Sequence, residues 1–261
     1  MSHGNDLMSE GPLRVTCSSV HTGRAEASGD VHMHLEEAFE DFVAQVEHLE
    51  ALLSRGADDL RQRRFVHSSA GMETAPFLVC HSADPASRYC LYYRCHAWLL
   101  ALGGSPTAIC DAILSPKSIS PMQPRVEGLP VDFISVTVGA QLPVALGLAL
   151  AGRPAVATVG DGGLSSGVVF ESLNSAAIHR PDLLVVLDDN GRAISSARST
   201  VCRAEPSVLC SSLDLEYFAV PAGDIGVFAV ALDWVRSTSG TPRLLHVTTS
   251  RSAAHCLSMA T

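Results

Sequence analysis

The sequence predicts an α/β fold with a mostly parallel central sheet and helices on both faces. The first observation is the unit 154–190, in which two buried strands flank a helix: Ala155 to Val159, Gly167 to His179, and Leu183 to Leu187. The second is a further alternation of strand and helix patterns up to residue 249. Strands joined through helices pair in parallel, because the crossover returns the chain to the same edge of the sheet.

Length and composition limit the class of protein. A chain of 261 residues is long enough for one large α/β domain. A formal charge of −9 without a basic run disfavours nucleic acid or a membrane surface as a partner. The eight cysteines form no C-x-x-C pair, the chain starts without a signal sequence, and the most apolar run, Leu142 to Ala151, is too short to span a membrane. We therefore expect a cytoplasmic protein with reduced thiols.

The first third of the chain is expected to contain an arm and a long helix. Residues 1–30 are rich in Ser, Gly, His and charge without periodicity, which predicts a flexible N-terminal arm. Residues 31–261 are expected to form a single domain. It starts with an amphipathic helix that Gly56 would stop, because apolar residues recur in alternating steps of four and three at Leu35, Phe39, Phe42, Val46, Leu49 and Leu53.

The last third of the chain continues the alternation. Residues 191–213 are polar and contain three arginines, so they form either a cover over the site or an ordinary solvated loop. A strand is expected from Glu216 to Val220, then a helix capped by Asp224, and a final strand from Leu244 to Thr249.

The turn after the first strand of the 154–190 unit is expected to hold the chemistry. It reads Gly160, Asp161, Gly162, Gly163, so a helix start and its backbone N–H groups face the crevice at the strand ends, where a phosphate would fit. A carboxylate such as Asp161 repels a phosphate unless a cation lies between them. Mg²⁺ takes oxygen ligands, and the amide oxygen of Asn190 follows the neighbouring strand.

The spacing of these residues resembles a known motif. Gly160-Asp161-Gly162, then 27 residues, then Asn190 is similar to the motif of proteins that bind thiamine diphosphate. The resemblance implies the three-layer thiamine-diphosphate-binding fold. It also implies that Asp161, Asn190 and the backbone carbonyl of Arg192 hold Mg²⁺, and that Mg²⁺ holds the cofactor's diphosphate beside the Gly160–Gly163 turn.

An earlier segment resembles the alpha subunit of the thiamine-dependent decarboxylase component of 2-oxo acid dehydrogenase complexes. The matching residues, in order, are Phe65, Gly71-Met72-Glu73 and Tyr93-Arg94-Cys95-His96-Ala97. The resemblance implies that Arg94 contacts the diphosphate, that Tyr93 lies by the cofactor, and that His96 is a catalytic residue near its reacting end. Met72 and Ala97 depart from the family's Gln and Gly.

Two further segments support the same resemblance. Val138-Gly139-Ala140-Gln141-Leu142-Pro143 is similar to the family's Gly-Ala-Gln-x-Pro turn, which implies that Val138 lies under the cofactor. Thr249-Ser250-Arg251-Ser252-Ala253-Ala254-His255 is similar to the family's Thr-Tyr-Arg-x-x-Gly-His, which implies that His255 is a second catalytic histidine. The loop from Pro116 to Pro130 lacks the family's Gly-Gly-Ser-Met-His core.

The implied enzyme needs a second chain. The family activates its cofactor with a glutamate from another domain, and Glu171, on the helix after the turn, would face the wrong end of the cofactor. A beta-type subunit carrying that glutamate is therefore expected, in an α2β2 assembly. The implied reaction is decarboxylation of a 2-oxo acid, followed by transfer to a lipoyl domain or another carbonyl acceptor, with His96 and His255 as proton donors or orienting groups.

Four alternatives remain open from the sequence. The first is a split transketolase-like carboligase subunit, which the Asp188-to-Gly191 sequence also suits. The second is a dinucleotide-binding module, although Ser165 stands where the third glycine of that fingerprint belongs. The third is a serine hydrolase built on Ser165, Asp224 and His255. The fourth is a degenerate subunit with a structural role only.

Overall fold

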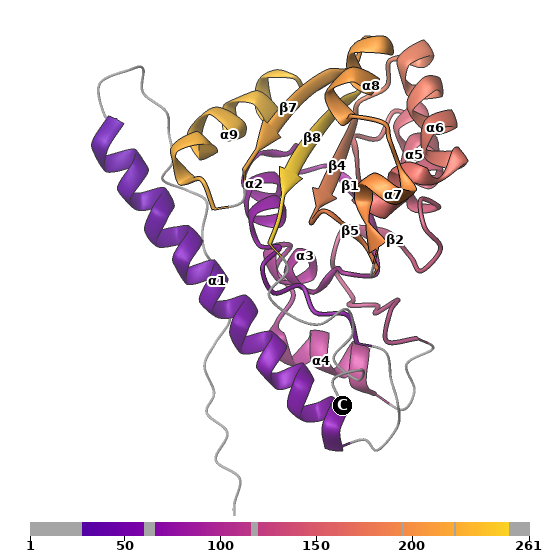
Figure 1. Cartoon of the computed structure of the whole chain (residues 1–261). Coiled ribbons are helices and arrows are strands. Elements are labelled where there is room, and N and C mark those ends of the chain that lie inside the picture. Colours follow the sequence, from indigo (N-terminus) through magenta and orange to yellow (C-terminus); the bar gives the residue numbers. More distant parts are fainter. Residues whose placement is uncertain (1–27, 60–65, 116–119, 195, 222, 251–261) are drawn as a thin grey trace, which may run out of the picture.

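A computed structural model describes residues 28–59, 66–115, 120–194, 196–221 and 223–250 (Figure 1). The expected arm lies almost entirely outside these residues. Phe65 and His255 also lie outside them, so the expected arm and the expected role of His255 stay predictions.

The described residues form one six-stranded sheet in which every neighbouring pair of strands is parallel. The strand order is β2-β1-β3-β4-β8-β7. The bounds are Arg88–Tyr92 for β1, Val131–Ser135 for β2, Ala155–Gly160 for β3, Leu183–Asp189 for β4, Glu216–Val220 for β7 and Arg243–Thr248 for β8. A separate antiparallel hairpin pairs β5 (Arg192–Ala193) with β6 (Ser196–Ala197).

Helices cover both faces of the sheet. Figure 1 shows α5 and α6 on one face, and α1, α2 and α9 on the other. The α-helices span Ser28–Asp59 (α1), Thr74–Ser82 (α2), His96–Ala101 (α3), Pro106–Leu114 (α4), Gln141–Leu150 (α5), Gly167–His179 (α6), Arg198–Val201 (α7), Pro206–Ser212 (α8) and Phe228–Ser237 (α9), and the 3-10 helices span Asp161–Ser165 (η1) and Ile225–Val227 (η2). The predicted α/β fold with a parallel sheet is thus confirmed.

The strands bury side chains on both faces, because successive residues of a strand point in opposite directions. In β4, Leu183, Val185 and Leu187 belong to the core under α5 and α6. Leu184 and Val186 belong to the other core, which includes residues of α1, α2 and α9. Continuous apolar strands with two cores are typical of parallel sheets, and they produce the three layers.

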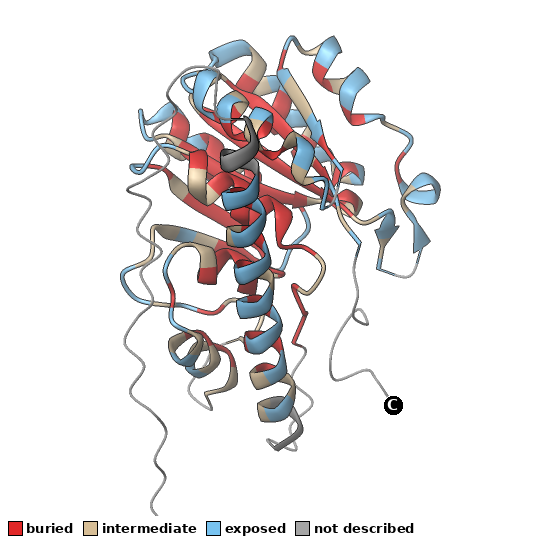
Figure 2. Cartoon of the chain, turned by 90° about the vertical axis from the view of Figure 1, so that its left-hand side faces the viewer, coloured by how far each residue is buried: buried red, intermediate tan, exposed pale blue. Residues whose placement is uncertain are grey.

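Helix α1 packs one side on the domain, as the sequence predicts. All six residues of the apolar stripe are buried, whereas Figure 2 shows that the outward face of the helix is exposed. The predicted stop at Gly56 is wrong, since α1 continues to Asp59. A β-carbon at Gly56 would collide with the Leu114 side chain of α4, so this glycine permits close helix packing.

Other boundaries differ in smaller ways. β4 includes Asp188 and Asp189, which the sequence placed after the strand. Asp224 precedes η2, not α9, and makes no side-chain capping bond. The segment 191–213 contains β5, β6, α7 and α8. In the part of the chain that the structure describes, no helix has the length and apolarity needed to cross a membrane.

The packing of α1 leads to a stability prediction. Leu49 is completely buried, so Leu49→Ala should lower the free energy of unfolding by about 2–5 kcal/mol through the lost contacts and the cavity. Urea unfolding followed by circular dichroism measures the change. The control is Ile178→Ala on α6, because Ile178 is 66% exposed and its truncation should cost little. Equal effects of the two substitutions would contradict the described packing of α1.

Candidate cofactor site

A cavity of about 630 Å³ opens at the carboxyl ends of the strands. The chain passes from β1 to β2 on one side and then crosses to β3 on the other, so the strand order reverses between β1 and β3. Ligands of doubly wound sheets bind at such a switch point. The cavity is lined by Tyr92, Tyr93, Arg94, Ser135, Thr137, Val138, Gly139, Gln141, Gly160, Asp161, Gly162, Gly163, Ser165, Ser166, Asn190, Arg192, Ala193, Ile194, Ser196 and Val201.

Residues from four strand ends meet in this cavity, because parallel strands end at the same edge. They include every residue that the sequence predicts to bind the cofactor or the metal: Tyr93, Arg94, Val138, Gly160, Asp161, Gly162, Gly163, Asn190 and Arg192. Their position is therefore as expected, and their roles as ligands stay predictions.

Asp161 begins η1 directly after β3, and its residue is 3% exposed. Its Oδ1 accepts a 2.8 Å hydrogen bond from the Gly162 amide, whereas Oδ2 has no hydrogen-bond partner among the described residues. Burial, the largest cause, and the nearby Asp189 carboxylate raise the pKa of Asp161 to about 6, although the Gly162 and Arg192 amides act in the opposite direction. A buried carboxylate oxygen without a donor is suited to contact a cation.

Asn190 lies between β4 and the β5–β6 hairpin. Its Oδ1 accepts a 3.0 Å hydrogen bond from the Arg192 amide, which holds the turn closed. Asp161 and Asn190 offer the oxygen donors that Mg²⁺ prefers. Mg²⁺ commonly takes only one or two protein ligands and completes its shell with phosphate and water, so these two oxygen donors fit it. No group of three or more His, Cys, Asp or Glu side chains in the described ranges could hold a metal ion by itself.

The last two residues of β4 point to opposite faces of the sheet. Asp188 is buried, and this burial raises its pKa to about 7, while a hydrogen bond with the Tyr92 hydroxyl lowers it. Burial also acts to raise the pKa of Asp189, but its contacts with His246, Gly191 and Arg198 bring it below its usual value. Asp189 is therefore the acid of this pair that lies against an arginine, Arg198.

The glycines of the turn allow close backbone approach. A β-carbon at Gly163 would lie 2.7 Å from Val159 Cγ1, and one at Gly162 would lie 3.1 Å from Ala193 Cβ. Ser165 donates its hydroxyl hydrogen to the Gly162 carbonyl at 2.8 Å, which closes the turn. The turn therefore offers the cavity a tightly packed backbone surface.

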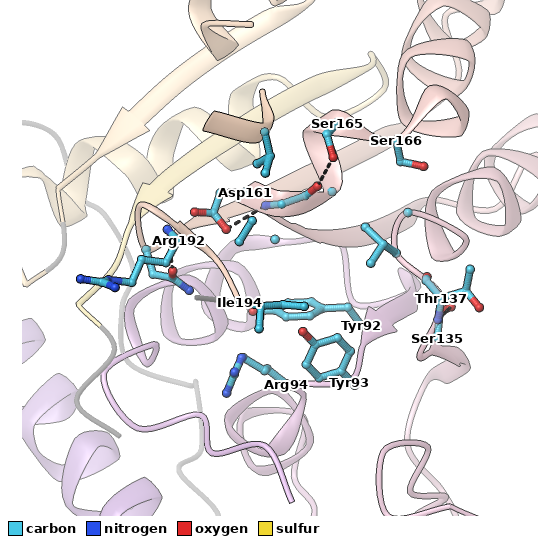
Figure 3. Close-up of a pocket in the computed structure, with 18 of the residues that line it drawn as sticks. Tyr92, Tyr93, Arg94, Ser135, Thr137, Asp161, Ser165, Ser166, Arg192 and Ile194 are labelled. Carbon is cyan, nitrogen blue, oxygen red and sulfur yellow. Dashed lines mark hydrogen bonds between the residues drawn. The ribbon is translucent and has the colours of Figure 1, made fainter. Parts of the chain in front are cut away.

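The opposite wall of the cavity carries a cation. Figure 3 shows Arg94 and Tyr93 across the cavity from Asp161, with Ile194 between them. Arg94 is buried, donates to the Ser68 carbonyl at 2.8 Å, and has its guanidinium carbon 5.7 Å from the Tyr93 ring centroid. These contacts hold a positive charge in the wall before any ligand binds.

His96 lies behind this wall and is not among the lining residues. It is 1% exposed at the start of α3, and its Nδ1 donates to Glu50 Oε1 at 2.9 Å. Glu50 also accepts from the Ser69 amide at 2.8 Å. Burial acts to raise the pKa of Glu50, but His96 and these hydrogen bonds lower it below its usual value. The catalytic role of His96 stays a prediction, and its position is that of a support for the wall.

Several residues of the site carry little or no signal in the sequence. The His67 ring lies 4.5 Å from the Tyr93 ring, and only its place between Phe65 and Gly71 hints at this position. Ile194 lies in the hairpin with a φ of 59°, which is unusual for a β-branched residue and has no sequence signal. Gln141, by contrast, belongs to a turn that the sequence did identify, and it donates to the Thr158 carbonyl at 2.5 Å, which fixes the start of α5 to β3.

The site does not have the geometry of a serine hydrolase. A nucleophile elbow places the serine directly after a strand, but β3 ends at Gly160 and Ser165 closes the 3-10 turn. None of the described residues that line the cavity is a histidine. Ser165 also occupies the position of the third glycine of a dinucleotide-binding turn, as the sequence indicated.

A doubly wound parallel sheet with a cavity at its switch point is typical of α/β domains that bind a ligand at that edge of the sheet. Residues 45–258 match the family described as the dehydrogenase E1 component. Because this match covers most of the chain, the chain belongs to the dehydrogenase E1 component family. The expected resemblance to E1 alpha subunits is confirmed.

Individual relatives match smaller parts. The pyruvate dehydrogenase E1 component subunit alpha of Zymomonas mobilis is 31% identical over 132 residues, which cover 46% of this chain and 37% of that protein. The 1-deoxy-D-xylulose-5-phosphate synthase of Hahella chejuensis is 42% identical over 79 residues, 28% of this chain and 12% of that protein. A transketolase structure from Campylobacter jejuni superposes with a TM-score of 0.65 at 16% identity, covering 80% of this chain and 37% of that one, which shows a shared fold.

The close packing of the Gly160–Gly163 turn can be tested by adding a β-carbon. Gly163→Ala should lower the free energy of unfolding by about 1–3 kcal/mol, because its β-carbon would overlap the Val159 side chain. Gly167→Ala is the matched control, since no atom lies within 4 Å of a β-carbon there, and it should be neutral or stabilising. Thermal unfolding compares the two. Equal stability of both variants would mean that the turn is not tightly packed.

The hydrogen bonds of the buried Glu50 should contribute to stability in a pH-dependent way. Glu50→Ala leaves the Ser69 amide and His96 without their acceptor, so it should cost about 2–3 kcal/mol of unfolding free energy at pH 7. Because folding lowers the pKa of Glu50, its stabilisation is fully present above the usual value of 4.5 and is lost as the pH falls further. Urea unfolding at a series of pH values measures this dependence.

The control for Glu50 is Glu40→Ala, on the exposed face of the same helix. It should have little effect at any pH. A Glu50→Ala penalty that stays unchanged as the pH falls well below 4.5 would exclude the ionised carboxylate as its source.

Proposed function

We propose that this chain is the alpha-like subunit of a two-subunit enzyme that uses thiamine diphosphate and Mg²⁺ to act on a 2-oxo acid. The observation that carries the proposal is the buried Asp161 carboxylate, whose Oδ2 has no partner among the described residues and which lines the cavity together with Asn190. Membership of the dehydrogenase E1 component family supports this class of chemistry.

The proposed binding roles divide between the two walls of the cavity. Asp161, Asn190 and the Arg192 carbonyl would hold Mg²⁺. Arg94 and the backbone of the Gly160–Gly163 turn would hold the diphosphate, because one supplies a cation and the other supplies N–H donors at a helix start. Tyr93 and Val138 would flank the rings of the cofactor.

Thiamine diphosphate supplies the electron sink for breaking the bond to a carboxylate. The residues of this chain bind, orient and exclude water. Arg94, fixed by Ser68, would keep the anionic end of the cofactor in place. His96 would support the wall through Glu50. Because His96 does not line the cavity, its expected proton transfer requires that the imidazole ring move towards it. His255 remains the proposed second proton donor.

A partner chain is part of the proposal. The described lining residues include no glutamate, and Glu171 is exposed on α6 outside the cavity, so the activating glutamate would come from a beta-type subunit. Val138 is 53% exposed and Ile194 is 63% exposed beside the cavity, which suits coverage by another chain. We propose an α2β2 assembly. The chain spans 37% or less of the length of each of the relatives compared above.

A split transketolase-like carboligase subunit is the second candidate. The 42% identity to part of a 1-deoxy-D-xylulose-5-phosphate synthase supports it. The two candidates differ in the acceptor. Reduction and acylation of an added lipoyl domain by the assembled complex would favour the dehydrogenase type. A new carbon–carbon bond to an added aldehyde would favour the carboligase type.

The Asp161 carboxylate provides the test of the proposal. Wild-type chain, co-purified with its partner, should bind thiamine diphosphate in isothermal titration with Mg²⁺ and lose this binding in EDTA. Asp161→Ala should weaken binding at least about 100-fold, because it removes a charged metal ligand.

Asp233→Ala is the matched control, because it removes an exposed carboxylate on α9 that does not line the cavity. It should bind as wild type does. The proposal fails if the wild-type complex does not bind thiamine diphosphate with Mg²⁺, or if Asp161→Ala binds it equally well.

A further inference from the structure

A chain of polar contacts supports the turn that contains Asn190, from the side away from the cavity. It joins four segments: Tyr217 on β7, His246 on β8, Asp189 at the end of β4, and Arg198 at the start of α7. None of these four residues lines the cavity. The binding roles proposed above therefore leave these contacts unexplained.

The Asp189 carboxylate is at the centre of these contacts. Its Oδ1 accepts from the Gly191 amide at 2.9 Å. Its Oδ2 accepts from His246 Nε2 at 3.0 Å and lies 3.3 Å from Arg198 Nε. The Tyr217 hydroxyl and His246 Nδ1 are 2.8 Å apart, so the imidazole is itself held on its far side. A buried carboxylate with donors on both oxygens has one well-defined orientation.

Arg198 connects this carboxylate to the wall of the cavity. Its backbone amide donates to the Gly191 carbonyl at 2.9 Å, which closes the segment that contains the β5–β6 hairpin. Its guanidinium also donates to the Ala204 carbonyl at 3.4 Å and lies 3.6 Å from Glu205. Arg198 is thus bonded at both ends of the 191–205 segment.

The hairpin needs such an anchor. Ile194 has a φ of 59°, a strained conformation for a β-branched residue that persists only where the surrounding structure holds it. β5 and β6 are only two residues each and pair with no other strand of the described sheet. Contacts outside the hairpin must therefore keep Arg192 and Ile194 in the wall.

We propose that Asp189, His246 and Arg198 form a clamp that sets the position of Asn190 and the Arg192 carbonyl as metal ligands, with Arg198 and His246 as positioning residues. The clamp acts through the Gly191 amide and carbonyl, one residue from each ligand. Its effect on metal binding rests on the proposed function. Its effect on the turn does not, because the contacts are present in the chain itself.

An ordinary surface ion pair would have no such effect. Arg180 and Asp214 form one, at 3.5 Å, and the Asp214 side chain is fully exposed. Such pairs contribute little. The Asp189 and Arg198 side chains are 8% and 20% exposed, so their contact is shielded from water and has a partner on each side. Arg180→Met is therefore the matched control for Arg198→Met.

Hydrogen exchange of the full chain, without cofactor, tests the clamp directly. Arg198→Met should speed exchange of the Gly191 and Arg192 amides by about tenfold or more, as expected from losing a contact to a charged group. Arg180→Met should leave these amides unchanged. Arg198→Lys keeps the charge, so the Gly191 and Arg192 amides should exchange more slowly in this variant than in Arg198→Met. Wild-type exchange rates in folded Arg198→Met would overturn the proposal, and Arg198→Lys carries the same test if the first variant does not fold.

Metal titration separates this inference from the proposed function. The Mg²⁺ concentration at half-maximal thiamine diphosphate binding should rise about tenfold or more in Arg198→Met, a size typical of losing a group that orients a metal ligand. Saturating Mg²⁺ should restore full binding, whereas Asn190→Ala should remain weak.

An unchanged midpoint in Arg198→Met, with a weakened Asn190→Ala, would overturn the clamp and leave the proposed function standing. Absence of Mg²⁺-dependent binding in wild type, with faster exchange in Arg198→Met, would overturn the proposed function and support the clamp as a device that holds the turn.

Discussion

The parallel pairing of β3 with β4 is the constraint on which the site depends. The two strands pair from Ala155 opposite Leu183 to Gly160 opposite Asp188, without a break in register. They therefore end at the same level, and the residues that follow them, Asp161 and Asn190, enter the same cavity. A shift of one residue would point every side chain of a strand to the other face and separate these oxygen atoms.

The rest of the fold supports the carboxyl ends of β3 and β4 from two sides. On one side, Glu50 of α1 fixes Ser69 and His96 behind the wall that carries Arg94. On the other side, His246 of β8 and Arg198 fix Asp189 behind the turn that carries Asn190. Both supports are buried carboxylates. Asp189 has donors on both oxygens, whereas Glu50 accepts from Ser69 and His96 on Oε1 and its Oε2 has no hydrogen-bond partner among the described residues. Such hydrogen bonds orient a buried carboxylate, which suits a site that must bind charged groups in a defined geometry.

The sequence predicts the parts of the site that depend on local patterns. The helix Gly167–His179 and the spacing from Asp161 to Asn190 are visible because periodicity and glycine punctuation are local signals. The contacts of Glu50 with His96, of His67 with Tyr93 and of Arg198 with Asp189 are not, because tertiary packing brings these residues together. The β5–β6 hairpin also escaped prediction, since strands of two residues have no periodicity. The sequence therefore predicts the residues that line the cavity better than the residues that hold them in place.

The position of the bound metal would show directly whether Asp161 and Asn190 are its ligands. Crystals of the full complex grown with Mn²⁺ and thiamine diphosphate would locate the ion through its anomalous scattering. We expect one peak between the diphosphate, the Asp161 carboxylate and the Asn190 amide oxygen, with Asp161 Oδ2 bound to the ion. A bound cofactor with no peak at Asp161, or with Asp161 turned away from the ion, would contradict this expectation.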